Sequence, residues 1–176
     1  MVTLRQLWTK PESRFLIVFL ALLIGGFFVI ALQPVNDAVV VPFTTGVATV
    51  SGAVLQLFED DLTVVGCDLR SPRFAVTIYN GCNGLITSLI FVAGVLAFPA
   101  GIRAKAIGIV VGLVAIQLVN LVRIVALFYT GVYLPDLFDE SHLVIWQSIV
   151  ILFGVALWIT WARLATRTVA PHHHGT

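Results

Sequence analysis

Long runs of apolar residues constrain this chain more than any other feature. The hydrocarbon core of a bilayer takes about 20 helical residues, and uncharged runs near that length cover residues 15–32, 85–99 and 143–162. A fourth run, 106–129, is interrupted only by Arg123. Because 59% of the residues are hydrophobic and only 11% are charged, a soluble monomer is excluded. We therefore predict an all-α integral membrane protein with four transmembrane helices, at about residues 15–32, 82–99, 106–129 and 142–162.

Basic residues flank these runs and predict their orientation, because Lys and Arg near the ends of spans remain on the cytoplasmic side. They lie before the first span, between the second and third spans, and after the last span: Arg5, Lys10, Arg14, Arg103, Lys105, Arg163 and Arg167. All of them lie inside only if the chain crosses an even number of times between residues 14 and 103. The apolar segment 38–58 is therefore expected to lie in, or dip into, the outer interface, and both termini are expected to be cytoplasmic.

The predicted outer loop, residues 33–81, contains a change of pattern. Apolar residues alternate with smaller or polar ones on both sides of Arg70-Ser71-Pro72-Arg73, which is typical of two short strands joined by a turn. We expect a small β-hairpin that rests on the interfacial helix or on the bundle, since an isolated hairpin is only marginally stable.

Three reactive side chains are predicted to lie at one depth on three different spans. Counted from the nearest basic flank at about 1.5 Å per helical residue, Arg123 lies about 27 Å into the membrane, and Cys82 and His142 each lie about 31 Å into it. Ionisable groups inside a bilayer are costly and usually functional. A thiol, a guanidinium and an imidazole are therefore expected near the outer membrane surface.

The neighbouring residues favour chemistry at this level. The sequence Asn-Gly-Cys-Asn-Gly, residues 80–84, leads into the second span, so we expect Cys82 at a helix N-terminus, where the dipole favours a thiolate. Gln117 and Arg123 belong to one polar stripe on the third span, and His142 can exchange protons near neutral pH. Candidates for orienting or oxyanion roles are Asn80, Asn83 and Asn120.

Each of the three reactive residues also has a structural interpretation. Cys82 and Cys67 can pair as a disulfide in an oxidising outer compartment. Arg123 can extend toward outer headgroups, and His142 can be an ordinary interfacial residue. The joint occurrence of the three at one level favours the chemical interpretation.

The three motifs resemble the exosortase/archaeosortase family of membrane-embedded cysteine transpeptidase-like enzymes, in particular its compact exosortase H branch. Cys82 matches in Asn-Gly-Cys-Asn-Gly, Arg123 in Asn-Leu-Val-Arg-Ile and His142 in Ser-His-Leu. The resemblance implies that these residues form a catalytic triad with Cys82 as nucleophile. The spans and their basic flanks predict a single membrane-embedded domain, residues 15–169, between a cytoplasmic N-terminus, 1–14, and a C-terminal tail, 170–176, and the resemblance implies that this domain is catalytic.

The function that this resemblance implies is that of a cysteine protease or transpeptidase, a hydrolase of the cytoplasmic (inner) membrane. It would cleave C-terminal sorting signals of exported proteins through a thioester at the outer face, without a metal or an organic cofactor. The implied partners are the lipid bilayer and exported proteins that end in a short motif, a transmembrane helix and a basic end. A formal charge of +1 argues against nucleic acid as a partner.

Two other functions remain open from the sequence. One is a membrane thiol-disulfide oxidoreductase that uses Cys67 and Cys82, although these residues do not form a Cys-x-x-Cys pair. The other is a non-enzymatic membrane scaffold in which Arg123 pairs with a carboxylate of a partner.

Overall fold

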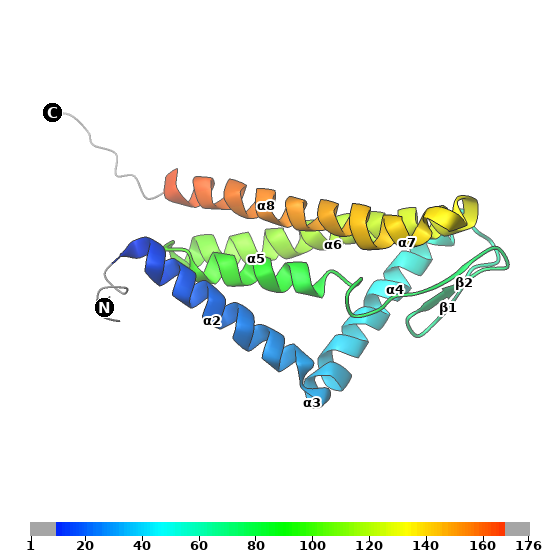
Figure 1. Cartoon of the computed structure of the whole chain (residues 1–176), viewed down its shortest axis with the longest axis horizontal. Coiled ribbons are helices and arrows are strands. Elements are labelled where there is room, and N and C mark those ends of the chain that lie inside the picture. Colours follow the sequence, from blue (N-terminus) through cyan, green and yellow to red (C-terminus); the bar gives the residue numbers. More distant parts are fainter. Residues whose placement is uncertain (1–9, 168–176) are drawn as a thin grey trace.

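A helical bundle carries a small β-sheet at the end opposite to the two chain termini (Figure 1). The computed structural model describes residues 10–167, so residues 1–9 and the predicted tail, 170–176, lie outside the described part. The elements in chain order are α2 (Pro11–Ala31), α3 (Gln33–Val35), the π-helical turn η1 (Asn36–Val40), α4 (Val41–Leu55), β1 (Thr63–Val65), β2 (Asp68–Arg70), β3 (Ala75–Thr77), α5 (Leu85–Ala97), α6 (Ile102–Tyr133), the 3₁₀ turn η2 (Pro135–Leu137), α7 (Phe138–Glu140), the π-helical turn η3 (Ser141–Trp146) and α8 (Gln147–Arg167).

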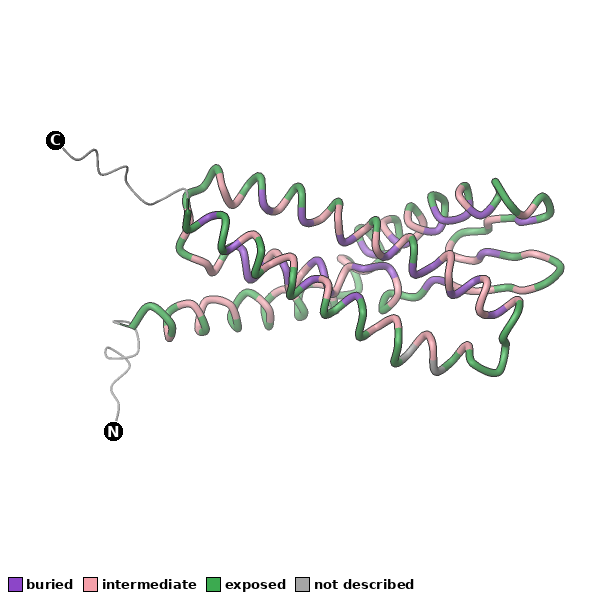
Figure 2. The backbone as a smooth tube through the Cα atoms, turned by 90° about the horizontal axis from the view of Figure 1, so that it is seen from above, coloured by how far each residue is buried: buried purple, intermediate pink, exposed green. Residues whose placement is uncertain are grey.

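The helices at the terminal end pack around α5, which contacts α2, α6 and α8. A cluster of buried side chains from Phe91, Val95 and Ile116 fills the space between α5 and α6. None of the residues of α2 is buried (Figure 2). Its many exposed apolar side chains agree with a helix that faces lipid on most of its surface.

Two prolines divide the segment between α2 and the sheet. Pro34 has no N–H with which to continue α2, and Leu32 adopts an extended conformation where α2 ends. Pro42 stands at the start of α4, after the π-helical turn η1, and likewise lacks an N–H for the preceding turn. As a result α4 leaves α2 at a sharp angle and packs against α6, β1 and β2 (Figure 1).

Four helical segments among residues 10–167 are long and apolar enough to cross a membrane, so the chain is a multi-pass membrane protein. The predicted number of four apolar helices is confirmed, but by length and composition the four include residues 33–55 in place of the predicted second span. The segment Gln33–Leu55, which we expected to be interfacial, has 23 residues, whereas α5 has only 13. At about 1.5 Å per residue α5 is about 20 Å long, which is less than the hydrocarbon core.

The sheet has three antiparallel strands in the order β1-β2-β3, not the two of the predicted hairpin. Gly66, at a φ of 60°, lies in the turn between β1 and β2, a backbone conformation that favours glycine. The strand that the pattern missed, β2, includes Arg70, which we had assigned to the turn. Leu69 from β2 and Ile78 join Phe128 of α6 in the core cluster at this end of the molecule.

Candidate active site

Cys82 lies in the loop 78–84, which connects β3 to α5. Its backbone N–H donates to the carbonyl of Tyr79 at 2.8 Å, which closes a turn just before Cys82. Gly84 adopts a φ of 77°, and α5 begins only at Leu85. The expectation that Cys82 occupies the helix N-terminus was therefore wrong, because the left-handed residue at position 84 separates the cysteine from the first turn of the helix.

Two asparagines of this loop fasten it to the segment before the sheet. The buried Asn83 donates from Nδ2 to Thr44 Oγ1 at 2.8 Å, and its Oδ1 accepts from the Leu85 N–H at 2.9 Å. Asn80 donates from Nδ2 to Asn36 Oδ1 at 2.9 Å. These side chains hold the loop between α4, η1 and α5, and thereby fix the position of the cysteine.

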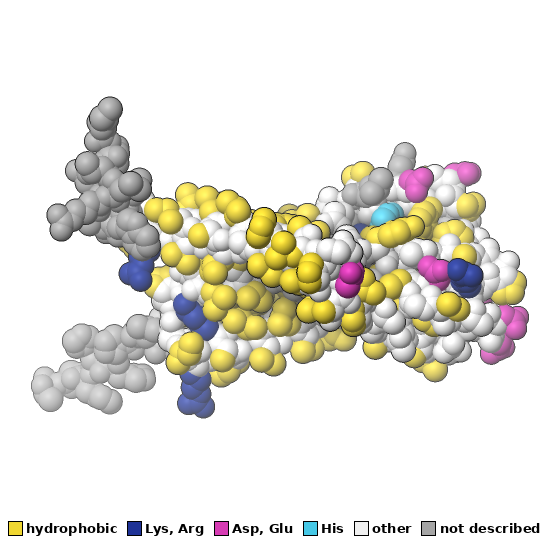
Figure 3. All heavy atoms as spheres, turned by 90° about the horizontal axis from the view of Figure 1, so that it is seen from below, with side chains coloured by type: hydrophobic (Ala, Val, Ile, Leu, Met, Phe, Trp, Pro, Cys, Tyr) yellow, Lys and Arg dark blue, Asp and Glu magenta, His cyan; other side chains and the backbone are white. Residues whose placement is uncertain are grey.

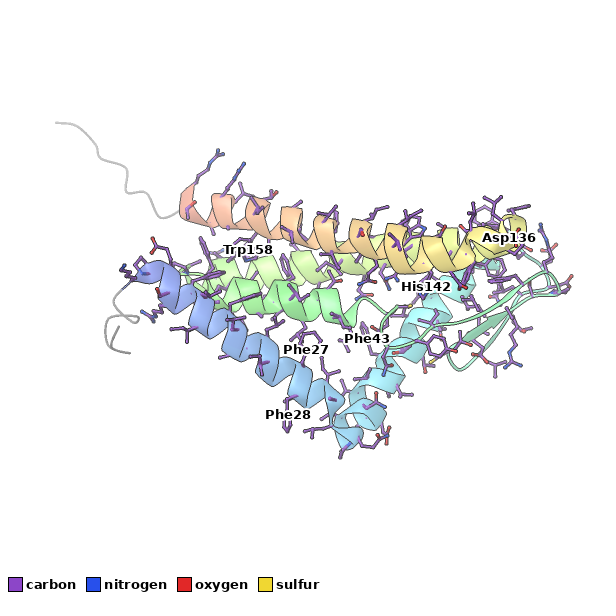
Figure 4. All side chains as sticks on the ribbon, in the orientation of Figure 1. Phe27, Phe28, Phe43, Asp136, His142 and Trp158 are labelled. Carbon is purple, nitrogen blue, oxygen red and sulfur yellow. The ribbon has the colours of Figure 1, made fainter. Side chains whose placement is uncertain are left out.

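His142 belongs to the π-helical turn η3, which leads into α8 (Figure 4). Its Nε2 lies 2.6 Å from Cys82 Sγ, in direct hydrogen-bond contact. The ring of Phe138, one turn earlier, stacks on the imidazole with centroids 5.9 Å apart and an interplanar angle of 18°. The ring of Phe74 in turn contacts the ring of Phe138, with the two centroids 5.2 Å apart. Phe138 therefore packs against one face of the imidazole, and Phe74, in the loop between β2 and β3, packs against Phe138. Short π-helical turns often occur at functional sites.

Arg123 reaches the same sulfur from α6. Its side chain is buried, and Nη2 donates to Cys82 Sγ at 3.8 Å. Its Nε has no hydrogen-bond partner within residues 10–167. Asn120, one turn earlier on α6, is also buried, and neither its Nδ2 nor its Oδ1 has a partner in the described chain. Asn120 and Gln117 pack against Gly84, where a methyl group would come within 3.2 Å of the Asn120 Cγ.

The thiol, the guanidinium and the imidazole therefore meet, in agreement with their similar predicted depths. Arg123 stands 21 residues after Ile102, which corresponds to about 32 Å along α6. Cys67 and Cys82 are both free thiols. Cys67 Sγ lies 3.6 Å from Thr45 Oγ1, so the disulfide that the sequence left open is not formed.

Burial and nearby charge determine whether the Cys82 thiol and the His142 imidazole carry a charge at rest. Both residues lie outside the helical spans. Burial raises the pKa of the Cys82 thiol, and the positive charge of Arg123 acts in the opposite direction. Burial lowers the pKa of His142, Arg123 lowers it further, and the carboxylate of Asp139 raises it. A neutral thiol beside a neutral imidazole is thus the favoured pair near pH 7, which leaves Nε2 free to accept a proton.

A cavity of about 350 Å³ opens beside the sulfur and the imidazole. It is lined by β3 and its continuation, by one face of α6 and by the segment before η3: Ala75, Val76, Thr77, Ile78, Tyr79, Cys82, Ile124, Leu127, Phe138, Asp139 and His142. Within residues 10–167 no three His, Cys, Asp or Glu side chains are placed to hold a metal ion.

Sequence reasoning missed two residues that shape this site. Tyr79 fixes the turn before Cys82 through its carbonyl, and no side-chain pattern signals such a role. Phe138 was detectable, because it precedes His142 by four residues and therefore lies on the same face of a helix.

The site thus brings a half-buried cysteine into contact with a histidine and an arginine, inside a multi-pass helical bundle. The model of the family described as transmembrane exosortase (Exosortase_EpsH) matches residues 2–162. The chain belongs to this family, which confirms the resemblance found in the sequence. The family implies a cysteine peptidase or transpeptidase in general, which acts on exported proteins that carry sorting signals. No curated protein and no solved structure matches the chain.

Proposed function

We propose that this protein is a cysteine transpeptidase or protease that cleaves the C-terminal sorting signal of exported proteins through a thioester on Cys82. The contact of 2.6 Å between Cys82 Sγ and His142 Nε2 carries the proposal. A nucleophile within hydrogen-bond reach of a base is the arrangement that covalent acyl transfer requires. The cavity beside the pair gives a peptide access to the sulfur.

The first half of the reaction forms the thioester. His142 Nε2 takes the thiol proton while the sulfur of Cys82 attacks the carbonyl carbon of the scissile peptide. The bond between this carbon and the amide nitrogen then breaks, and the imidazolium returns its proton to the departing amine. The acyl group of the exported protein remains on the sulfur.

Arg123 is the candidate for stabilising the oxyanion that forms in this step. The backbone N–H of Cys82 is already bonded to the Tyr79 carbonyl, so it is not available to the substrate. The guanidinium carries a permanent charge, reaches the sulfur through Nη2 and keeps an unpartnered Nε within the described chain. A buried donor of this kind is worth more in a site from which water is excluded than in solution.

The second half of the reaction releases the acyl group. A water molecule or an incoming amine gives a proton to His142 as it attacks the thioester carbonyl, and the proton then passes to the departing sulfur. Water yields hydrolysis, and an amine yields transfer to another carrier.

Charge placement supports an active site on the outer face of the inner membrane. Most of the described Lys and Arg side chains gather at the end of the bundle where α2 begins and α8 ends (Figure 3). Most Asp and Glu side chains lie around the sheet, where Arg70 and Arg73 pair with Asp68 and Glu59. Basic residues near span ends remain in the cytoplasm. The sheet, the loop 78–84 and His142 then face the periplasmic or extracellular side, where an exported substrate arrives.

Co-expression with an exported protein that ends in a short motif, an apolar span and basic residues tests the proposal. The intact chain should shorten this protein, whereas Cys82→Ala, Arg123→Ala and His142→Ala should leave it at full length. Cys67→Ser serves as the matched control and should retain processing. Processing by all three site variants, or its loss in Cys67→Ser, would refute the proposal, and the second result would favour thiol redox chemistry.

A further inference from the structure

The strand nearest to the sulfur is an edge of the sheet. The order β1-β2-β3 leaves β3 with a neighbour on one side only. Five consecutive residues from Ala75 to Tyr79 line the cavity that contains Cys82 and His142. The edge of the sheet and the candidate active site are therefore parts of one continuous surface.

Hydrogen bonds between β2 and β3 show which backbone groups this edge leaves free. Ile78 N–H donates to the Cys67 carbonyl, and Ser71 N–H donates to the Phe74 carbonyl, each at 2.9 Å. Partners on antiparallel strands alternate between bonded and non-bonded pairs, so the even-numbered residues of β3 point their backbone groups toward β2. Ala75 and Thr77 point theirs the opposite way, to the free edge, and no backbone bond to them is present within residues 10–167.

The free edge borders the cavity beside Cys82, since both Ala75 and Thr77 line it. Phe138, Asp139 and His142 line the same cavity, and Ile124 and Leu127 of α6 give it an apolar floor. Figure 1 shows the sheet beside α7 at this end of the bundle. Cys82 lies on the continuation of β3, after the turn at Tyr79, so the cavity leads to the nucleophile.

We propose that the exported substrate binds as an extended strand along the free edge of β3, paired with the backbone of Ala75 and Thr77, and that this pairing delivers the scissile bond to Cys82. The inference rests on the proposed function. Unpaired N–H and C=O groups of an edge strand bind another extended chain readily. Side chains of an extended peptide alternate between two faces, so every second residue of the sorting motif would contact the apolar floor formed by Ile124 and Leu127.

Amide hydrogen exchange at single-residue resolution tests this proposal. The full chain with Cys82→Ala, in detergent, is compared with and without the tail-bearing protein of the co-expression experiment. Binding should slow exchange at the Ala75 and Thr77 amides at least tenfold. The Val76 and Ile78 amides should be protected in both samples because they bond to β2. Binding without slower exchange at Ala75 and Thr77 would overturn the strand proposal while leaving the proposed function intact, whereas absence of binding would overturn both.

Proline at position 75 gives a second test. Ala75→Pro removes an N–H that β2 does not use, so the sheet should keep its own bonds. Loss of one hydrogen bond should weaken binding of the tail-bearing protein by about threefold to tenfold. Ala75→Val keeps the N–H at a similar side-chain volume and should weaken binding less. Protection of Val76 and Ile78 in both variants verifies the sheet, and equal binding by the two variants would contradict the proposed pairing.

Discussion

Replacing Arg123 by glutamine should raise the pKa of the Cys82 thiol and slow its alkylation. The guanidinium Nη2 lies 3.8 Å from the sulfur. A unit charge at about 4 Å stabilises a thiolate by about 1 kcal/mol in water and by about 4 kcal/mol at an effective dielectric constant of about 20. Because one pKa unit corresponds to about 1.36 kcal/mol, the expected rise is roughly one to three units.

The assay measures the rate of alkylation of Cys82 by iodoacetamide as a function of pH, in a Cys67→Ser background so that only one thiol reacts. At a fixed pH below the pKa, Arg123→Gln should react tenfold or more slowly, since only the thiolate is nucleophilic. Arg123→Lys keeps a positive charge and should retain part of the reactivity. Identical pH profiles for the original side chain and for Arg123→Gln would refute the electrostatic role of the arginine, independently of any substrate.

Three further variants test the supports of the site. Asp139→Asn removes the carboxylate that raises the pKa of His142, so the acid limb of substrate processing should shift to lower pH; a shift to higher pH would contradict this. Gly84→Ala places a side chain at a φ of 77° and against Gln117, so it should lower the free energy of unfolding by about 1–3 kcal/mol, whereas Gly81→Ala, with no atom within 4 Å of the added methyl, should not. Phe138→Ala removes the ring stacked on His142 and should slow processing about twofold to tenfold, and Phe138→Tyr should restore the rate.

Hydropathy and charge predicted the membrane bundle because both act over whole helices. A rise of about 1.5 Å per residue converts sequence distance into depth. It placed Cys82, Arg123 and His142 at similar depths, and these side chains meet in the structure. Arg123 stood out because an isolated charge within an apolar run requires a partner. These predictions depend on long-range averages, and averages of that kind tolerate errors at single residues.

Details that depend on one backbone conformation were not predictable in this way. The left-handed Gly84 shortens α5 and separates Cys82 from the helix, but a glycine in sequence does not reveal its φ. The length of the α3–η1–α4 segment depends on how Pro34 and Pro42 are accommodated by π-helical geometry. The second strand, β2, was missed because Leu69 is its only apolar residue, and a single apolar residue shows no alternating pattern.

The hydrogen-bond partners of the asparagines were likewise not predictable from the sequence. Asn83 was one of the candidates for an orienting or oxyanion role, and in the structure its side chain joins Thr44 to the start of α5. Asn120 keeps both amide atoms unpartnered within the described chain, and it remains the stronger candidate for an orienting role. Asn83 differs from Asn120 only through a tertiary contact, since its partner Thr44 lies 39 residues away in the sequence.

The most direct measurement is the mass of the intact protein after incubation with the tail-bearing substrate and rapid quenching with acid. We expect a covalent adduct on Cys82 whose added mass equals that of the hydrolysed, shortened product less one water, and which hydroxylamine removes, as for a thioester. The adduct should be absent in Cys82→Ala. Shortening of the substrate by Cys82→Ala, or an adduct that forms on Cys67 instead, would contradict the account.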